Sequence, residues 1–225
     1  MTKVLSGKFA LVTGGSRGIG AATARELAAQ GASVAISYSA SEVRANEVVA
    51  AIQSLGGTAI AFQADQAVEQ QVIKLVADVV QHFRRLVILV NNAGVFETGA
   101  IDTTTDTSGF ARQNLINYVA VVAAIREASR VMTDGGRIIS ISSGIALRTA
   151  GPGFADYAAT KRAIEGYTKG AARDLAPKNI TVNAIGTGSI DTDMNPQDGP
   201  YSDWQKGVTP PPWAAMAARM RLLRS

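Results

Sequence analysis

The chain has 225 residues, of which 47% are hydrophobic and 18% are charged. This length accommodates one sizeable α/β domain, and the composition is typical of a folded globular protein rather than a disordered or fibrous one. No apolar run reaches the roughly 18 to 20 residues of a membrane span, and residues 1–3 lead straight into the first expected strand without a signal-peptide core. We therefore expect a single-domain cytoplasmic protein with no membrane partner.

Cysteine is absent and His82 is the single histidine, which excludes disulfides, thiolate metal sites and histidine-based triads or metal clusters. We expect His82 to lie at the surface near the end of a helix. The formal net charge of +4 arises entirely from Trp204 onward, where there are no acids and four basic residues, Lys206, Arg219, Arg221 and Arg224. Because the rest of the chain is neutral, we expect no nucleic-acid partner.

Short β-type runs alternate with amphipathic helical stretches up to about residue 185. The expected strands are 9–12, 34–38, 59–62, 86–90, 137–141 and 180–185. Several are apolar throughout, which is typical of strands buried on both faces of a parallel sheet. Helical spacing is clearest at Val72, Val76, Val79, Val80 and Phe83. The pattern predicts an α/β fold with a doubly wound parallel sheet, in which ligands bind at the carboxyl ends of the strands.

A glycine-rich turn follows the first expected strand and opens the first helix. Residues 13–20 read Thr-Gly-Gly-Ser-Arg-Gly-Ile-Gly, a T-G-x-x-x-G-x-G spacing that differs from the general G-x-G-x-x-G fingerprint. Glycine allows the sharp turn and a close approach to a pyrophosphate, and the helix N-terminus favours the anion. The turn predicts nucleotide contacts from Gly14, Ser16, Arg17, Gly18, Ile19 and Gly20.

The second strand ends where a site for NAD would usually place an acid, and no acid is present. Arg17, with Arg44 as a further candidate, is instead expected to meet a 2′-phosphate, helped by the serine hydroxyls. NADP(H) is therefore favoured over NAD(H). The expected contacts at this strand end come from Tyr38 and Ser39, with Ser37 and Ser41 as further hydroxyl donors.

Two later strand ends carry polar groups that would lie over the adenine and its ribose. Asp65 follows the third strand, and Asn92, Ala93 and Gly94 follow the fourth. Asn-Ala-Gly is also ordinary loop chemistry, so that motif alone is equally consistent with a simple turn.

The fifth strand ends at Ser143, and the next helix begins near Tyr157 and Lys161. Residues at positions i and i+4 share one face of a helix, so the phenol and the ammonium are expected to project together. A free phenol has a pKa near ~10, and a neighbouring cation lowers that pKa by favouring the phenolate. Tyr157 would then exchange a proton with an alkoxide or an alcohol.

Together these motifs resemble the short-chain dehydrogenase/reductase family over residues 5 to about 203. The glycine turn matches its T-G-x-x-x-G-x-G, residues 91–94 match its N-N-A-G, and Ser143, Tyr157 and Lys161 match its catalytic set. Asn117 falls where the family has its fourth catalytic residue. The closest likeness within the family is to NADPH-using 3-oxoacyl-acyl-carrier-protein reductases.

The resemblance implies a role for each matched residue. Tyr157 would transfer the proton, Lys161 would bind the nicotinamide ribose and lower the tyrosine pKa, and Ser143 would hold the substrate oxygen. Asn117 would position a water leading to Lys161, and Ile190 and Thr192 would hold the nicotinamide carboxamide. The expected reaction is the reduction of a ketone to a secondary alcohol, with a 3-oxoacyl thioester as one candidate substrate.

Three features depart from the family pattern. Val87 stands where the family usually has Asp, and Thr187-Gly188 stands where it usually has Pro-Gly. Residues 207–225 stand where the family has a helix and a seventh strand, and resemble a truncated or out-of-frame end. We therefore expect a nucleotide-binding and catalytic domain over residues 1–203, an atypical tail over 204–225, and a Rossmann sheet without its usual last strand.

Two functions are left open. The first is an active NADP(H)-dependent oxidoreductase acting on CH–OH groups, assembled as a homo-oligomer, a dimer or tetramer, through helices around residues 110–132 and 154–176. The second is a catalytically weak or inactive nucleotide-binding protein or sensor on the same scaffold. The sequence does not identify the substrate, because the substrate pocket is expected to be formed by loops around residues 95–105, 144–155 and 190–210.

Overall fold

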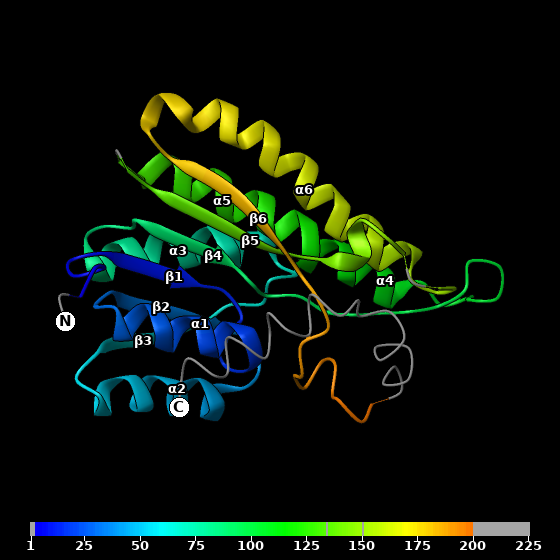
Figure 1. Cartoon of the computed structure of the whole chain (residues 1–225), viewed down its shortest axis with the longest axis horizontal. Coiled ribbons are helices and arrows are strands. Elements are labelled where there is room, and N and C mark those ends of the chain that lie inside the picture. Colours follow the sequence, from blue (N-terminus) through cyan, green and yellow to red (C-terminus); the bar gives the residue numbers. More distant parts are fainter. Residues whose placement is uncertain (1–2, 134, 150, 200–225) are drawn as a thin grey trace.

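The computed structural model describes residues 3–133, 135–149 and 151–199. Within these ranges a parallel sheet of six strands has the order β3-β2-β1-β4-β5-β6 (Figure 1). The strands are β1 (Phe9–Val12), β2 (Ser33–Tyr38), β3 (Thr58–Gln63), β4 (Ile88–Asn91), β5 (Arg137–Ser143) and β6 (Thr181–Thr187). The α-helices are α1 (Gly18–Ala29), α2 (Glu42–Ser54), α3 (Glu69–Phe83), α4 (Ser108–Asn114), α5 (Ala120–Val131) and α6 (Ala155–Leu175).

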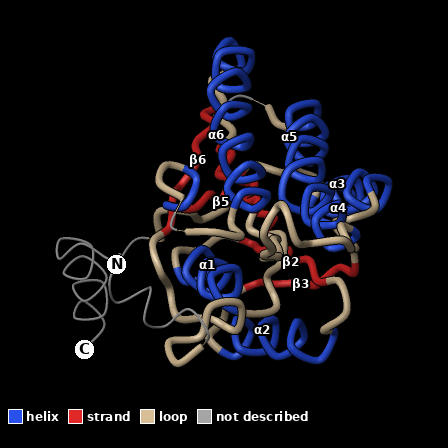
Figure 2. The backbone as a smooth tube through the Cα atoms, turned by 90° about the vertical axis from the view of Figure 1, so that its right-hand side faces the viewer, coloured by secondary structure: helices blue, strands red, loops and turns tan. Residues whose placement is uncertain are grey.

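Two helical layers cover the sheet because both faces of its strands are apolar. In β1, Ala10 and Val12 pack into the cluster formed with α1 and α2. Leu11, between them in sequence, packs into the opposite cluster with α3, α5 and α6. Figure 2 shows the two groups of helices on opposite sides of the strands. The predicted doubly wound α/β fold is confirmed.

The strand order reverses beside β1, which pairs with β2 on one side and with β4 on the other. The loops that leave the carboxyl ends of β1 and β4 therefore diverge, and a ligand crevice is expected between them. The fourth strand begins two residues later than predicted, at Ile88 rather than Leu86. Leu86 and Val87 are nevertheless buried, so their apolar character reflects core packing before the strand begins.

The predicted apolar stripe lies on α3, where Val72, Val76 and Val79 are buried. His82 lies exposed in the last turn of α3, as expected, with its ring edge-on to Phe83 at 4.8 Å between centroids. None of the described helices is both long and apolar enough to cross a membrane. Among the described residues the sheet ends at β6, and the expected tail over 204–225 lies outside them.

Candidate active site

A cavity of about 690 Å³ opens at the carboxyl ends of the strands. Its wall combines the glycine turn, the ends of β2, β4 and β5, the start of α6 and the loop after β6. The predicted site residues that line it are Gly14, Ser16, Arg17, Gly18, Ile19, Tyr38, Ser39, Asp65, Asn92, Ala93, Gly94, Ser143, Tyr157, Lys161, Ile190 and Thr192. Gly20 and Asn117, also predicted, lie behind the wall.

The glycine turn is locked to the loop after β4. The Asn92 side chain donates to the carbonyl oxygens of Thr13 and Gly14 at 2.9 and 3.0 Å. The Thr13 hydroxyl in turn accepts from the backbone N–H groups of Asn92 and Ala93. Gly14 has φ +64°, and a Cβ there would lie 2.9 Å from the Ala93 Cα. The two motifs therefore form one unit at the switch point, and Thr13 is a member that sequence reasoning did not assign.

Gly20 is required for packing rather than for lining the cavity. A Cβ on Gly20 would collide with the Gly14 carbonyl oxygen and the Asn92 amide nitrogen. Its contact with the cofactor stays a prediction.

Ser37 supports the same turn from β2. Its hydroxyl oxygen accepts from the Gly14 N–H at 3.2 Å, and the side chain is buried. The hydroxyl is the acceptor in this bond, which leaves its proton for another partner. Ser37 lines the cavity together with Tyr38 and Ser39.

Arg17 and Arg44, the two arginines expected to meet a 2′-phosphate, lie close enough to share one partner, and that partner is an acid. Arg17 of the glycine turn and Arg44 of α2 both contact one carboxylate oxygen of Asp193, at 3.4 and 2.6 Å. The hydrogen bond from Arg44, with the charges of both arginines, lowers the pKa of Asp193. Sequence reasoning missed Asp193, because it follows β6 and lies far from either arginine in the chain.

Asp65 also has a cationic partner that the sequence did not reveal. The Arg112 guanidinium, from α4, donates to both Asp65 carboxylate oxygens at 3.0 and 3.1 Å. The Asp65 carboxylate further accepts from the Ala67 N–H at 2.9 Å, which fixes its orientation. Both Asp65 and Arg112 line the cavity.

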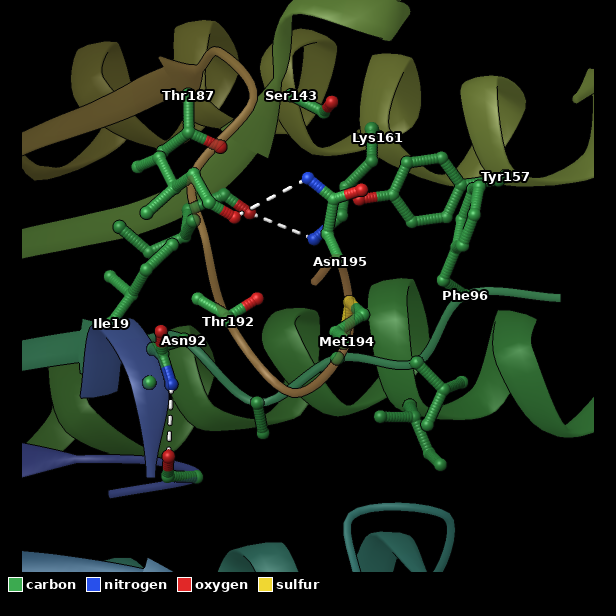
Figure 3. A pocket seen from close by; sticks show the side chains of 18 of the residues that line it. Ile19, Asn92, Phe96, Ser143, Tyr157, Lys161, Thr187, Thr192, Met194 and Asn195 are labelled. Carbon is green, nitrogen blue, oxygen red and sulfur yellow. Dashed lines mark hydrogen bonds between the residues drawn. The ribbon is translucent and has the colours of Figure 1, made fainter. Parts of the chain in front are cut away.

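Three predicted catalytic side chains converge at the opposite end of the cavity (Figure 3). Ser143 is the last residue of β5, and Tyr157 and Lys161 lie one turn apart on α6. The exposed fractions of Tyr157 and Lys161 are only 9% and 5%. The Lys161 ammonium donates to the Ile141 carbonyl oxygen at 2.9 Å and lies 5.7 Å from the centre of the Tyr157 ring.

The pKa of Tyr157 differs from the sequence-based expectation. Burial raises the pKa of Tyr157, and a hydrogen bond with Ser143 opposes this increase without overcoming it. Burial also lowers the pKa of Lys161 to about 8. Desolvation is thus the largest influence on the Tyr157 pKa, and the Lys161 ammonium is bonded to a backbone carbonyl.

Asn117 is fully buried in a π-helical turn, Leu115–Val119, that joins α4 to α5. Its amide accepts from the Val95 N–H and donates to the Val95 carbonyl oxygen, both at 2.9 Å. It also donates to the Thr160 hydroxyl on α6 at 3.3 Å. Such π-turns are frequent at functional sites. Asn117 therefore links the loop after β4 to the helix that carries Tyr157 and Lys161.

Ser142 ties β5 to α6 immediately beside Ser143. Its buried hydroxyl lies 3.2 Å from the Lys161 carbonyl oxygen and 3.0 Å from the Glu165 carboxylate, and donates its proton to one of them at a time. Thr187, one of the departures from the family pattern, donates from its hydroxyl to the Ser142 carbonyl oxygen at 3.3 Å. A proline at position 187 would lack the hydroxyl and therefore this bond. Threonine at this position thus adds a contact between β6 and β5.

Aromatic and aliphatic side chains surround the reactive end. Phe96 contacts the Tyr157 ring edge-on with centroids 4.7 Å apart, and stacks on Phe154 at 5.7 Å. Ile145, Leu147 and Met194 also line the cavity. The expected substrate loops thus contribute at residues 95–96, 144–145, 147–148, 154, 190 and 192–195, whereas residues 97–105 do not line it.

Comparison with known proteins gives consistent matches. The profile of the short chain dehydrogenase family matches residues 8–201. A hydroxynaphthalene reductase of Aspergillus fumigatus is 46% identical over 190 residues, which cover 84% of this chain and 69% of the relative. Versicolorin reductase 1 of Aspergillus parasiticus is 42% identical over 190 residues, which cover 84% of this chain and 72% of the relative.

Among solved structures, a short-chain dehydrogenase from Burkholderia cenocepacia in complex with NADP is 50% identical. It superposes with a TM-score of 0.88, covering 91% of this chain and 83% of that one. A blue fluorescent protein from a metagenomic library in complex with NADPH is 44% identical and superposes with a TM-score of 0.88. The match covers 91% of this chain and 83% of that one. The chain described here belongs to the short-chain dehydrogenase/reductase family of oxidoreductases.

Proposed function

We propose that this protein is an NADP(H)-dependent reductase that converts a ketone to a secondary alcohol. The observation that carries the proposal is the convergence of Ser143, Tyr157 and Lys161 on one cavity that also contains the glycine turn. The domain responsible would extend over residues 1–203.

The nucleotide end fits a phosphorylated dinucleotide. Gly14 and Gly18 have φ +64° and +54°, and the turn they form contains Arg17, which shares the Asp193 carboxylate with Arg44 of α2. The relatives solved with NADP and NADPH support the same cofactor for this chain. Bound NADPH would supply the hydride. Ile190 and Thr192 would hold its carboxamide, and Lys161 would bind its nicotinamide ribose.

Tyr157 would donate the proton to the substrate oxygen. A raised pKa keeps its phenol protonated at neutral pH, which is the form needed for reduction. Ser143 would hold the same oxygen by a hydrogen bond. Asn117 would hold the surrounding backbone and, as the family resemblance implies, a water leading to Lys161.

An aromatic ketone is the substrate that the cavity fits best. Phe96 and Phe154 place apolar ring surface beside Tyr157, and flat rings pack well against such surfaces. The similar fungal reductases are named for hydroxynaphthalene and versicolorin. A 3-oxoacyl thioester is the second candidate, from the resemblance to acyl-carrier-protein reductases. The faces of α4, α5 and α6 are proposed to assemble a dimer or tetramer.

Oxidation of NADPH and NADH should be followed with a bicyclic aromatic ketone, a 3-oxoacyl thioester and small aliphatic ketones. The Tyr157→Phe variant is measured beside the wild type. We expect NADPH oxidation, fastest with the aromatic ketone and nearly lost in Tyr157→Phe. Equal rates for the two proteins would contradict the role of Tyr157. Tight NADPH binding without turnover of any ketone would favour a nucleotide-binding protein or sensor instead.

A further inference from the structure

The loop after β6 crosses the cavity and reaches the nucleotide end through Asp193. Figure 3 shows this loop passing Ile19 and Asn92 through Thr192, and facing the catalytic side chains through Met194 and Asn195. One Asp193 oxygen contacts Arg17, 176 residues away in sequence, and Arg44, 149 residues away. The contact therefore joins the glycine turn, α2 and the loop after β6, which are distant from one another in the sequence.

The loop is a folded turn, so the position of Asp193 is defined. Thr192 and Asn195 exchange two backbone hydrogen bonds, at 3.3 and 3.0 Å. The Gln197 N–H donates to the Asp191 carboxylate at 3.0 Å. A Cβ at Gly18 would lie 3.4 Å from the Thr192 Cγ2, which shows that the turn rests directly against the glycine turn.

Arg17 and Arg44 are the two cations that the proposed function assigns to the 2′-phosphate. A carboxylate that engages both guanidinium groups competes with a phosphate for the same donors, and two anions at one site repel each other. The side chains of Arg17, Arg44 and Asp193 are 57%, 52% and 51% exposed. Exposed ion pairs are weak. A doubly charged phosphate is therefore able to replace the carboxylate, while a nucleotide without that phosphate is not.

We propose that Asp193 occupies the 2′-phosphate position between Arg17 and Arg44 and so competes with a 2′-phosphate, and that a bound 2′-phosphate displaces the carboxylate and frees the loop at residues 189–199 from the two arginines. This inference rests on the proposed NADP(H) cofactor. Because Met194 and Asn195 lie on the same loop and line the catalytic side of the cavity, the displacement links recognition of the phosphate to the shape of the substrate pocket.

The test uses adenine nucleotides that lack the nicotinamide, so that no reaction occurs. Hydrogen–deuterium exchange of residues 189–199 is measured with 2′,5′-ADP and with 5′-ADP, in the wild type, Asp193→Asn and Asp198→Asn. Asp198→Asn is the matched control, because it removes the same charge from the same exposed loop without touching the two arginines. Calorimetry gives the Kd of each nucleotide.

In the wild type, 2′,5′-ADP should accelerate exchange in the loop, and 5′-ADP should leave it unchanged. Asp193→Asn should exchange fast without nucleotide and bind 2′,5′-ADP about 3- to 10-fold more tightly, with the Kd of 5′-ADP unchanged. Asp198→Asn should behave as the wild type.

Slower loop exchange with 2′,5′-ADP, or an Asp193→Asn variant that binds it no more tightly than the wild type, would overturn the role of Asp193. If wild-type protein instead binds 2′,5′-ADP no more tightly than 5′-ADP, the phosphate site itself fails, and the proposed cofactor preference fails with it. The two failures are thus distinguished by the wild-type Kd values alone.

Discussion

The two ends of the cavity are built by different physical means. At the nucleotide end, Arg17, Arg44 and Asp193 are each more than half exposed and interact through ion pairs. At the catalytic end, Tyr157, Lys161 and Asn117 are buried and interact through hydrogen bonds with the backbone and neighbouring side chains. The first arrangement suits the exchange of one anion for another, and the second suits fixed positions for reacting groups.

The largest expected effect is on catalysis at the buried end. Ser143→Ala removes the hydroxyl proposed to hold the substrate oxygen and should lower kcat by roughly 10²- to 10³-fold. The Kd for NADPH should stay within a factor of about two, because Ser143 lies away from the glycine turn. Steady-state kinetics and fluorescence titration check the two quantities. Ser129→Ala, outside the cavity, serves as the control, and a loss confined to NADPH affinity would refute the assignment.

Asn117→Ala should reduce stability, because it leaves the Val95 N–H and carbonyl oxygen without their side-chain partner. Val95 is only partly buried, so these groups lose less than the roughly 1–3 kcal/mol of a fully buried unsatisfied group, and unfolding in urea should show a loss of about 1–2 kcal/mol in total. Asn114→Ala, at an exposed position on α4, should change stability little. Equal unfolding curves for the two variants would show that Asn117 does not hold the loop.

The lowered pKa of Lys161, about 8, predicts a pH-dependent stability. Between about pH 8 and pH 10 the unfolded chain keeps this proton while the folded chain releases it, so stability rises with pH. The free energy of unfolding of the wild type, relative to Lys161→Met, should therefore increase by on the order of 1–3 kcal/mol over this range. A difference independent of pH would show that the ammonium carries no burial cost.

Arg17→Ala should have the smallest effect, limited to the exposed end. The Kd for NADPH should rise roughly tenfold through loss of one charged hydrogen bond to the 2′-phosphate, with NADH affinity and stability unchanged. Arg25→Ala, which removes the same charge from an exposed position on α1, is the control. Equal losses for NADPH and NADH would place Arg17 on another part of the cofactor.

The sequence predicts the features that depend on local pattern. The apolar runs predicted the strands of the sheet, and the glycine spacing predicted the turn after β1. The four-residue spacing predicted that Tyr157 and Lys161 share one face of a helix. The Asp193 and Arg112 ion pairs were missed because each joins elements distant in the chain.

The pKa of Tyr157 was predicted in the wrong direction for a similar reason. The spacing with Lys161 is visible in sequence, whereas the burial of both groups and the Ile141 carbonyl that receives the ammonium depend on tertiary packing. Likewise the π-turn around Asn117 carries no distinct spacing signal, and only the folded chain shows it.

The central claim is that a hydride passes from NADPH to the carbonyl carbon of a ketone bound in this cavity. The most direct measurement uses NADPH deuterated on either face of nicotinamide C4, an aromatic ketone and mass spectrometry of the product. We expect a secondary alcohol carrying one deuterium from one of the two labelled cofactors, formed by the wild type and nearly absent with Tyr157→Phe. Unlabelled alcohol from both cofactors, or tightly bound NADPH with no alcohol formed, would contradict the account.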